Sequence, residues 1–163
     1  MAASASIHQT GFVTKPLHLD DQSKEIIALL QQDGRMSYAT IAKQVGLSEA
    51  AVRQRAQRLM EQGVMQIVAV TDPLQLGFAW EVMIGVRVSG NVKAVADELG
   101  EIEAIDFIVL TGGRFDILLE VVAESDQQLI TLTDKIRGIP GVVGCETLVY
   151  LSTRKQDYSW GVR

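Results

Sequence analysis

Hydrophobic positions between residues 19 and 63 recur at the three- and four-residue spacing that is typical of amphipathic helices. Asp20 or Asp21 can cap a first helix, Ser37 a second and Ser48 a third, because their side-chain oxygens accept hydrogen bonds from free backbone amides. A glycine follows the end of each segment, as is common at helix C-termini. The pattern therefore predicts three short helices.

Beyond residue 63 the hydrophobic period changes from that of a helix to that of a strand. Residues 64–70 are expected to be extended, and Asp72-Pro73 with Gly77 indicates a turn. The strands are predicted around Val82–Val88, Ile105–Val109, Phe115–Val121 and Val143–Leu151, and the helices around Val92–Leu99 and Leu129–Ile136. This β-α-β-β-α-β order predicts an α+β fold of the ferredoxin-like type, with both helices on one sheet face.

Apolar side chains are expected on both faces of this sheet, whereas two helices can cover only one. Phe107, Val143 and Cys145 are predicted on the covered face, where Cys145 would be a structural thiol. The residues predicted on the open face are Met83, Ile108, Leu110, Leu118, Leu148 and Tyr150. An apolar open face needs a cover, most simply a second copy of the chain, so we expect at least a homodimer.

These patterns divide the chain into five parts. They are a loose arm at 1–18, a helix-turn-helix domain at 19–66, a linker strand and turn at 67–77, a ferredoxin-like domain at 78–153 and a tail at 154–163.

Charge is distributed unevenly along the chain. The whole protein has 15 Lys and Arg against 20 Asp and Glu, a net charge of -5, which excludes a generally polybasic protein. Residues 34–66 carry five basic and two acidic side chains, a local balance of +3. A compact basic segment on an acidic chain suggests a module that binds a polyanion.

Other classes of protein are disfavoured by what the sequence lacks. Its apolar runs are too short to span a bilayer, and its N-terminus has no signal-peptide pattern. One cysteine cannot form an internal disulfide or a multi-cysteine metal site. We find no phosphate-binding glycine loop and no catalytic motif. We therefore expect a cytoplasmic protein without a metal, a cofactor or a membrane partner.

Residues 38–57 fit a helix-turn-helix, with the small Ala42 where the two helices meet and Gly46 in the turn. Projected at 100° per residue, the third helix turns Val52 and Ala56 inward. The predicted DNA-contacting residues are Ser37, Tyr38, Ser48, Ala50, Arg53, Gln54, Arg55, Gln57 and Arg58. Gln can pair with adenine and Arg with guanine, while Arg55 and Arg58 are better placed for phosphates. A solvated polar helix face is the alternative.

Several blocks, taken in order, resemble the Lrp/AsnC (leucine-responsive, feast or famine) family of bacterial and archaeal transcription regulators. They are Leu19-Asp20-Asp21, Asp33-Gly34-Arg35, Gly46-Leu47-Ser48, Val52, Arg55, Arg58-Leu59, Gly63-Val64, Asp72-Pro73, Leu76-Gly77, Thr111-Gly112-Gly113-Arg114-Phe115-Asp116 and Pro140-Gly141-Val142. The resemblance implies a winged helix-turn-helix, a strand-like linker and a ligand-sensing β-α-β-β-α-β domain. It also implies dimers that often form octamers and bind small effectors, usually amino acids, between dimers.

A sensor site is therefore expected at the turn 111–116. The candidate effector-binding residues are Leu110, Thr111, Gly112, Gly113, Arg114, Phe115, Asp116, Leu148 and Tyr150. Glycine amides allow close approach, Asp116 can accept from an ammonium group, and Arg114 can hold a carboxylate. Many relatives have an acidic residue after the first glycine, so the second glycine and Arg114 could change which effector fits or remove the effector altogether. The alternative is a plain hairpin whose Asp116 bonds backbone amides.

An enzyme is the competing hypothesis, because some tetrapyrrole-modifying decarboxylases resemble this family in fold. Those enzymes rely on histidines in the sensor-like domain, and this chain has none after His18. We therefore expect a regulator with no catalytic residues, whose dimer binds double-stranded DNA at a pseudo-palindromic operator under the control of an amino acid.

Overall fold

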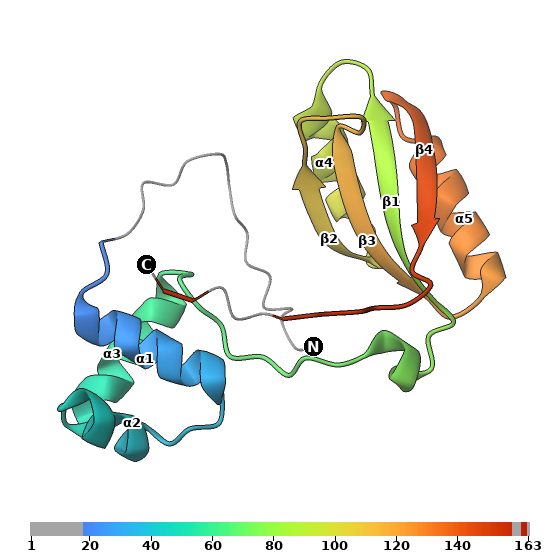
Figure 1. Cartoon of the computed structure of the whole chain (residues 1–163). Coiled ribbons are helices and arrows are strands. Elements are labelled where there is room, and N and C mark those ends of the chain that lie inside the picture. The colour runs from blue at the N-terminus through green and yellow to red at the C-terminus, as the bar shows by residue number, and fades with distance from the viewer. Residues whose placement is uncertain (1–17, 158–160, 163) are drawn as a thin grey trace. The chain divides into compact units, whose positions relative to one another are not determined.

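The computed structural model describes residues 18–157 and 161–162, so the predicted arm lies outside the described residues except for His18. The chain divides into two compact units, of which the second is Val70–Lys155. The first unit contains three helices, α1 (Asp21–Gln32), α2 (Tyr38–Val45) and α3 (Glu49–Glu61) (Figure 1). The three predicted helices are therefore confirmed.

Each helix of the first unit begins at a side chain that caps it. Asp20 Oδ1 accepts from the Ser23 amide at 2.8 Å, and the Ser37 and Ser48 hydroxyls accept from amides three residues on. Gly46 ends α2 in the left-handed region, at φ 69°, which glycine adopts at little cost. Apolar side chains from all three helices fill the core, the fully buried ones being Ile26, Ile41, Val52 and Ala56.

The segment between the two units is extended but forms no strand. From residue 64 to residue 72 the described chain has no strand partner, and the short 3-10 helix η1 (Pro73–Leu76) follows. No wing hairpin is formed here within the described residues. Ile67, Val68 and Val70 are exposed. Among the described residues, no helix has the length and apolar character needed to cross a membrane.

The second unit is a four-stranded antiparallel sheet with two helices on one face (Figure 1). Its elements are β1 (Trp80–Val88), α4 (Val92–Gly100), β2 (Ile105–Leu110), β3 (Ile117–Ala123), α5 (Asp126–Arg137) and β4 (Val142–Val149). The strand order is β2-β3-β1-β4. Alternate residues of β1 and β3 form the core with both helices, since Val82, Ile84 and Leu119 are fully buried. The predicted α+β fold is confirmed.

Two irregularities change which side chains face the helices. The β2–β3 register shifts between Ile105 and Phe107, so that Ile105 and Ile108 both pack against the core. Phe107 is 48% exposed, and Leu110, paired with the buried Ile117, also packs against the core. The predictions that Phe107 faces inward and that Ile108 and Leu110 lie on the open face are therefore wrong, because the extra residue reverses the alternation.

The second irregularity lies between β1 and β4. The register shifts between Arg87 and Val88, so that Val142 packs against the core while Val143 is 61% exposed. The inward placement of Val143 is therefore wrong. Cys145 pairs with Val86 and packs against the same core, as predicted.

Candidate functional site

Helix α3 separates a packing face from a polar face. Val52, Ala56 and Leu59 are buried in the first unit. The predicted DNA-contacting side chains that are exposed on this helix are Ala50, Arg53, Gln54, Gln57 and Arg58. These five side chains are therefore exposed on α3, whereas Arg55 is partly buried and bonded to α1.

Two of the predicted contacts, Ser37 and Ser48, cap α2 and α3. The Ser37 hydroxyl accepts from the Thr40 amide at 3.1 Å, and the Ser48 hydroxyl accepts from the Ala51 amide at 3.2 Å. Their side chains thus fix where the two helices begin, and both residues remain exposed. A capping serine can still donate its hydroxyl hydrogen to a neighbouring acceptor.

Arg53 links the start of α2 to α3. Its guanidinium donates to Glu49 one turn earlier at 2.8 Å and lies 5.3 Å from the centroid of the Tyr38 ring. More than half of each charged side chain is exposed, so this ion pair is weak and readily exchanged for another partner. Tyr38 and Glu49 therefore orient the Arg53 side chain, and its guanidinium can still bind another partner.

The remaining polar side chains of this face differ in their partners. Gln57 donates to Glu61 at 3.0 Å. Gln54 and Arg58 have no hydrogen-bond partner within residues 18–157. An exposed amide and an exposed guanidinium without internal partners are free to bind an external ligand.

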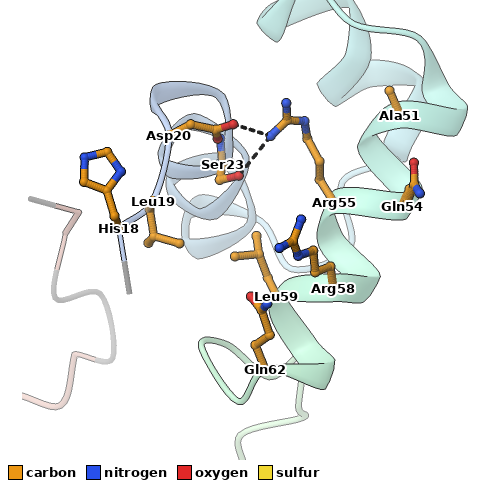
Figure 2. A pocket seen from close by; sticks show the side chains of 10 residues that line it. All are labelled: His18, Leu19, Asp20, Ser23, Ala51, Gln54, Arg55, Arg58, Leu59 and Gln62. Carbon is orange, nitrogen blue, oxygen red and sulfur yellow. Dashed lines mark hydrogen bonds and ion pairs between the residues drawn. The ribbon is translucent and has the colours of Figure 1, made fainter. Parts of the chain in front are cut away.

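Arg55 is instead engaged by the start of α1, as Figure 2 shows. Its Nη1 donates to Asp20 at 2.6 Å and to Ser23 at 3.2 Å (Figure 2). Its Nη2 donates to Gln22 at 3.0 Å. Hydrogen bonds from Ser23 and from the Arg55 guanidinium hold the pKa of Asp20 well below its usual range. The predicted phosphate-binding residue thus also joins α1 to α3.

Sequence reasoning missed the three α1-side partners of Arg55. Asp20 was expected only as a helix cap, and one carboxylate oxygen does serve that purpose. Its other oxygen binds a guanidinium 35 positions away in the chain. No local spacing indicates such a pair, because it depends on how two helices cross.

In the second unit, the turn 111–116 closes the end of the sheet. The Thr111 amide donates to the Asp116 carbonyl at 2.9 Å, and the Thr111 hydroxyl donates to the Phe115 carbonyl at 2.6 Å. Asp116 Oδ2 accepts from the Val88 amide at 2.7 Å. Asp116 therefore bonds a backbone amide, as the plain-hairpin alternative expected, and keeps its second oxygen for another donor.

Gly112 and Gly113 are not required by the shape of this turn. Neither has a positive φ, and a Cβ at either position would meet no atom within 4 Å. Nothing within the described chain explains the glycines. Bare backbone facing open space permits close approach by a molecule from outside.

Two side chains of the turn lie against the open sheet face. The Phe115 ring covers Gly85, where a Cβ would stand 2.6 Å from ring carbons. Arg114 donates to Glu146 of β4 at 2.5 Å and lies 5.3 Å from the Phe115 ring centroid. The exposed ion pair places a cation and an anion side by side next to the bare glycines.

The three predicted apolar lining residues do not converge. Leu110 packs on the helix-covered face, whereas Leu148 is 48% exposed and pairs with Met83 on the open face. Within one chain Leu110 and Leu148 therefore lie on opposite faces of the sheet, because the bulge in β2 turns Leu110 toward the helices. Tyr150 donates its hydroxyl to Glu120 at 3.0 Å.

Tyr150 belongs to an acidic group on the open face that sequence reasoning did not identify. Partial burial, the hydrogen bond to Glu120 and the nearby negative charges raise the pKa of Tyr150 to about 12. Partial burial first, and then the charge of Glu120, also raise the pKa of both Glu81 and Asp106. Asp106, Glu120 and Glu81 lie on β2, β3 and β1, which are neighbours in the sheet. The strand order, which the sequence does not reveal, brings these acids close together.

A helix-turn-helix with a basic exposed helix, followed by a separate α+β domain, defines a DNA-binding regulator with a sensor module. The AsnC-type helix-turn-helix domain model matches residues 19–60, and the Lrp/AsnC ligand binding domain model matches residues 81–160. The chain therefore belongs to the Lrp/AsnC family of transcriptional regulators.

Individual relatives agree with this assignment. An uncharacterised HTH-type transcriptional regulator of Pyrococcus furiosus is 33% identical over 144 residues, which cover 86% of this chain and 97% of that protein. The leucine response regulatory protein LrpA of Mycobacterium tuberculosis is similar in structure, with a TM-score of 0.77, 25% identity and coverage of 85% and 97%. A Neisseria meningitidis transcriptional regulator in complex with L-Met shares the fold, with a TM-score of 0.74, 20% identity and coverage of 87% and 96%.

Proposed function

We propose that the protein binds a specific operator through α3 and that an amino acid bound in the second unit controls this binding. The observation that carries the DNA-binding part is the exposed face of α3, which presents Arg53, Gln54 and Gln57 to solvent. The opposite face of this helix is buried, and Ser48 caps its start. These side chains match the donor and acceptor patterns of guanine and adenine in the major groove. A regulator that acts on chromosomal DNA would work in the cytoplasm.

The operator is proposed to be pseudo-palindromic because the protein is proposed to act as a homodimer. Phe107 and Leu148 leave apolar surface on the sheet face that α4 and α5 do not cover. A second copy would bury that surface, and a two-fold dimer presents two recognition helices to two half-sites about one helical turn, or a multiple of it, apart. Further assembly to an octamer stays a prediction from the family.

The turn 111–116 is proposed as the effector site. The support is the unexplained pair Gly112 and Gly113 beside the ion pair of Arg114 with Glu146. A free amino acid is a zwitterion, so its carboxylate can bind a guanidinium while its ammonium group binds a carboxylate oxygen. The Neisseria regulator of the same fold, whose complex contains L-Met, is consistent with an effector of this class.

Selection of bound duplexes from a random pool tests the DNA-binding proposal. We expect enrichment of paired half-sites, and we expect Arg53→Ala to alter the preferred base at one position of each half-site. Static light scattering at micromolar concentration should give a mass of at least twice 17.8 kDa. A pool without enriched sequences, or a stable monomer, would contradict the proposal.

A further inference from the structure

A polar hollow of about 590 Å³ lies between α3 and the start of α1. Figure 2 shows it from close by, with Arg55 and Arg58 extending from α3 toward α1. The residues that line it are His18, Leu19, Asp20, Ser23, Ala51, Gln54, Arg55, Arg58, Leu59 and Gln62. Its volume is in the range of ligand sites, and it adjoins the helix face assigned to DNA reading.

The charge of this hollow is set by three side chains. Arg55 and Arg58 contribute two positive charges and Asp20 one negative charge, so the lining carries a balance of +1. Both Asp20 oxygens are occupied, one by the Ser23 amide and one by Arg55. The contacts of Arg55 with Asp20, Gln22 and Ser23 fix its charge in place, where it offsets the carboxylate. Arg58 remains without an internal partner within residues 18–157.

We propose that this hollow seats one phosphodiester group of the DNA backbone, with Arg58 as the contacting cation and the ion pair of Arg55 with Asp20 as a fixed, neutral wall. This inference rests on the proposed DNA-binding function and deepens it. A backbone phosphodiester carries a single negative charge, which matches the balance of the lining. Gln62 adds a neutral amide donor at the same site, so the seat would fix register and carry no sequence information.

The test measures binding of a mixed-sequence duplex by fluorescence anisotropy at several salt concentrations. The variants are Arg58→Gln and, as the matched control, Arg35→Gln, which removes another exposed positive charge of the same unit outside the hollow. One lost phosphate contact lowers the slope of log affinity against log salt by about 0.9. Between 50 and 200 mM salt this corresponds to a loss of salt sensitivity of about three- to fourfold. Thermal melting checks that both variants are folded.

We expect Arg58→Gln to lower the slope and to weaken binding of all sequences alike, while Arg35→Gln keeps the parental slope. Inorganic phosphate added at constant ionic strength should not displace the duplex from the parent. If Arg58→Gln kept the parental slope, or if Arg35→Gln lowered the slope by the same amount, the proposed phosphate site would be wrong, while the proposed DNA binding would stand. Displacement by inorganic phosphate would instead assign the hollow to a free anion. A parent that binds no duplex at low salt would contradict the proposed function itself.

Discussion

The exposed face of α3 and the turn 111–116 use their polar side chains in different ways. On α3, Val52 and Ala56 pack inward while Arg53 and Gln54 face solvent, so packing and binding occupy separate sides of one helix. In the turn, Asp116 accepts from a backbone amide and Arg114 binds Glu146, so the groups proposed to bind an effector also make contacts within the chain. Substitution of Arg53 or Gln54 should therefore change binding with little effect on stability, whereas substitution of Asp116 or Arg114 should affect both.

The largest expected effect comes from the packing side of the first unit. Ile41 is fully buried among α1, α2 and α3, so Ile41→Ala should lower the free energy of unfolding by about 2–5 kcal/mol. Denaturant unfolding followed by circular dichroism measures this change. A loss below about 1 kcal/mol would show that this core collapses around the cavity.

A side chain added at Gly85 should disturb the packing of the second unit at the turn 111–116. Gly85→Ala places a Cβ against the Phe115 ring at 2.6 Å, so we expect a loss of about 1–3 kcal/mol of stability and displacement of the turn. Gly112→Ala is the matched control, since its Cβ would meet no atom, and it should melt like the parent. Thermal denaturation of both variants is the measurement. Equal melting temperatures for Gly85→Ala and the parent would refute the predicted clash.

Arg53→Ala tests whether the exposed face of α3 affects DNA binding without affecting stability. The side chain is exposed and its ion pair with Glu49 is solvated, so stability should change by less than about 0.5 kcal/mol. Affinity for the preferred operator should fall by about 1–3 kcal/mol, with relaxed preference at one base pair. Titrations of the operator and its single-base variants measure both. Unaltered preference would mean that Arg53 does not contact a base.

The smallest effect is expected from the acidic group on the open sheet face. In the folded chain the pKa values of Glu81 and Asp106 are raised, partly by Glu120. These two carboxyl groups therefore add to the free energy of unfolding at acidic pH, and this contribution is lost as the pH rises through their folded pKa values. Glu120→Gln keeps an acceptor for Tyr150 and removes this repulsion. It should stabilise the protein at pH 7 by less than about 1 kcal/mol, but not at pH 3.

Melting curves of the parent and of Glu120→Gln at the two pH values measure this difference. The prediction would be wrong if the stabilisation were equal at both, since a carboxylate that is already protonated repels no neighbour.

The helices of the first unit could be predicted from the sequence because their signals are local. Ser37, Ser48 and Gly46 cap or end helices within a few residues of their partners. The projection of α3 at 100° per residue placed Gln54 opposite the buried stripe and Arg53 on its flank, and both are exposed. It could not show that Asp20 binds Arg55, because that contact depends on the crossing of α1 and α3.

The sheet was predicted in order but not in detail. Strict alternation placed Phe107 inward and Leu110 outward, and one extra residue in β2 reverses both. Asp106 is the one polar residue of β2, and a single polar position among apolar ones does not show where the alternation shifts. The partners of Asp116 and Arg114 are likewise remote in sequence, so their use within the chain could not be foreseen.

Operator affinity measured with and without each of the twenty amino acids tests the proposed control of DNA binding most directly. The effector turn and α3 belong to different units, so a ligand can act only by favouring one assembly or conformation over another. We predict that at least one amino acid changes operator affinity by about 5- to 150-fold, and that Arg114→Ala alters which one does so. An operator affinity that none of the twenty moves, with no amino acid bound in calorimetric titrations, would contradict amino-acid control.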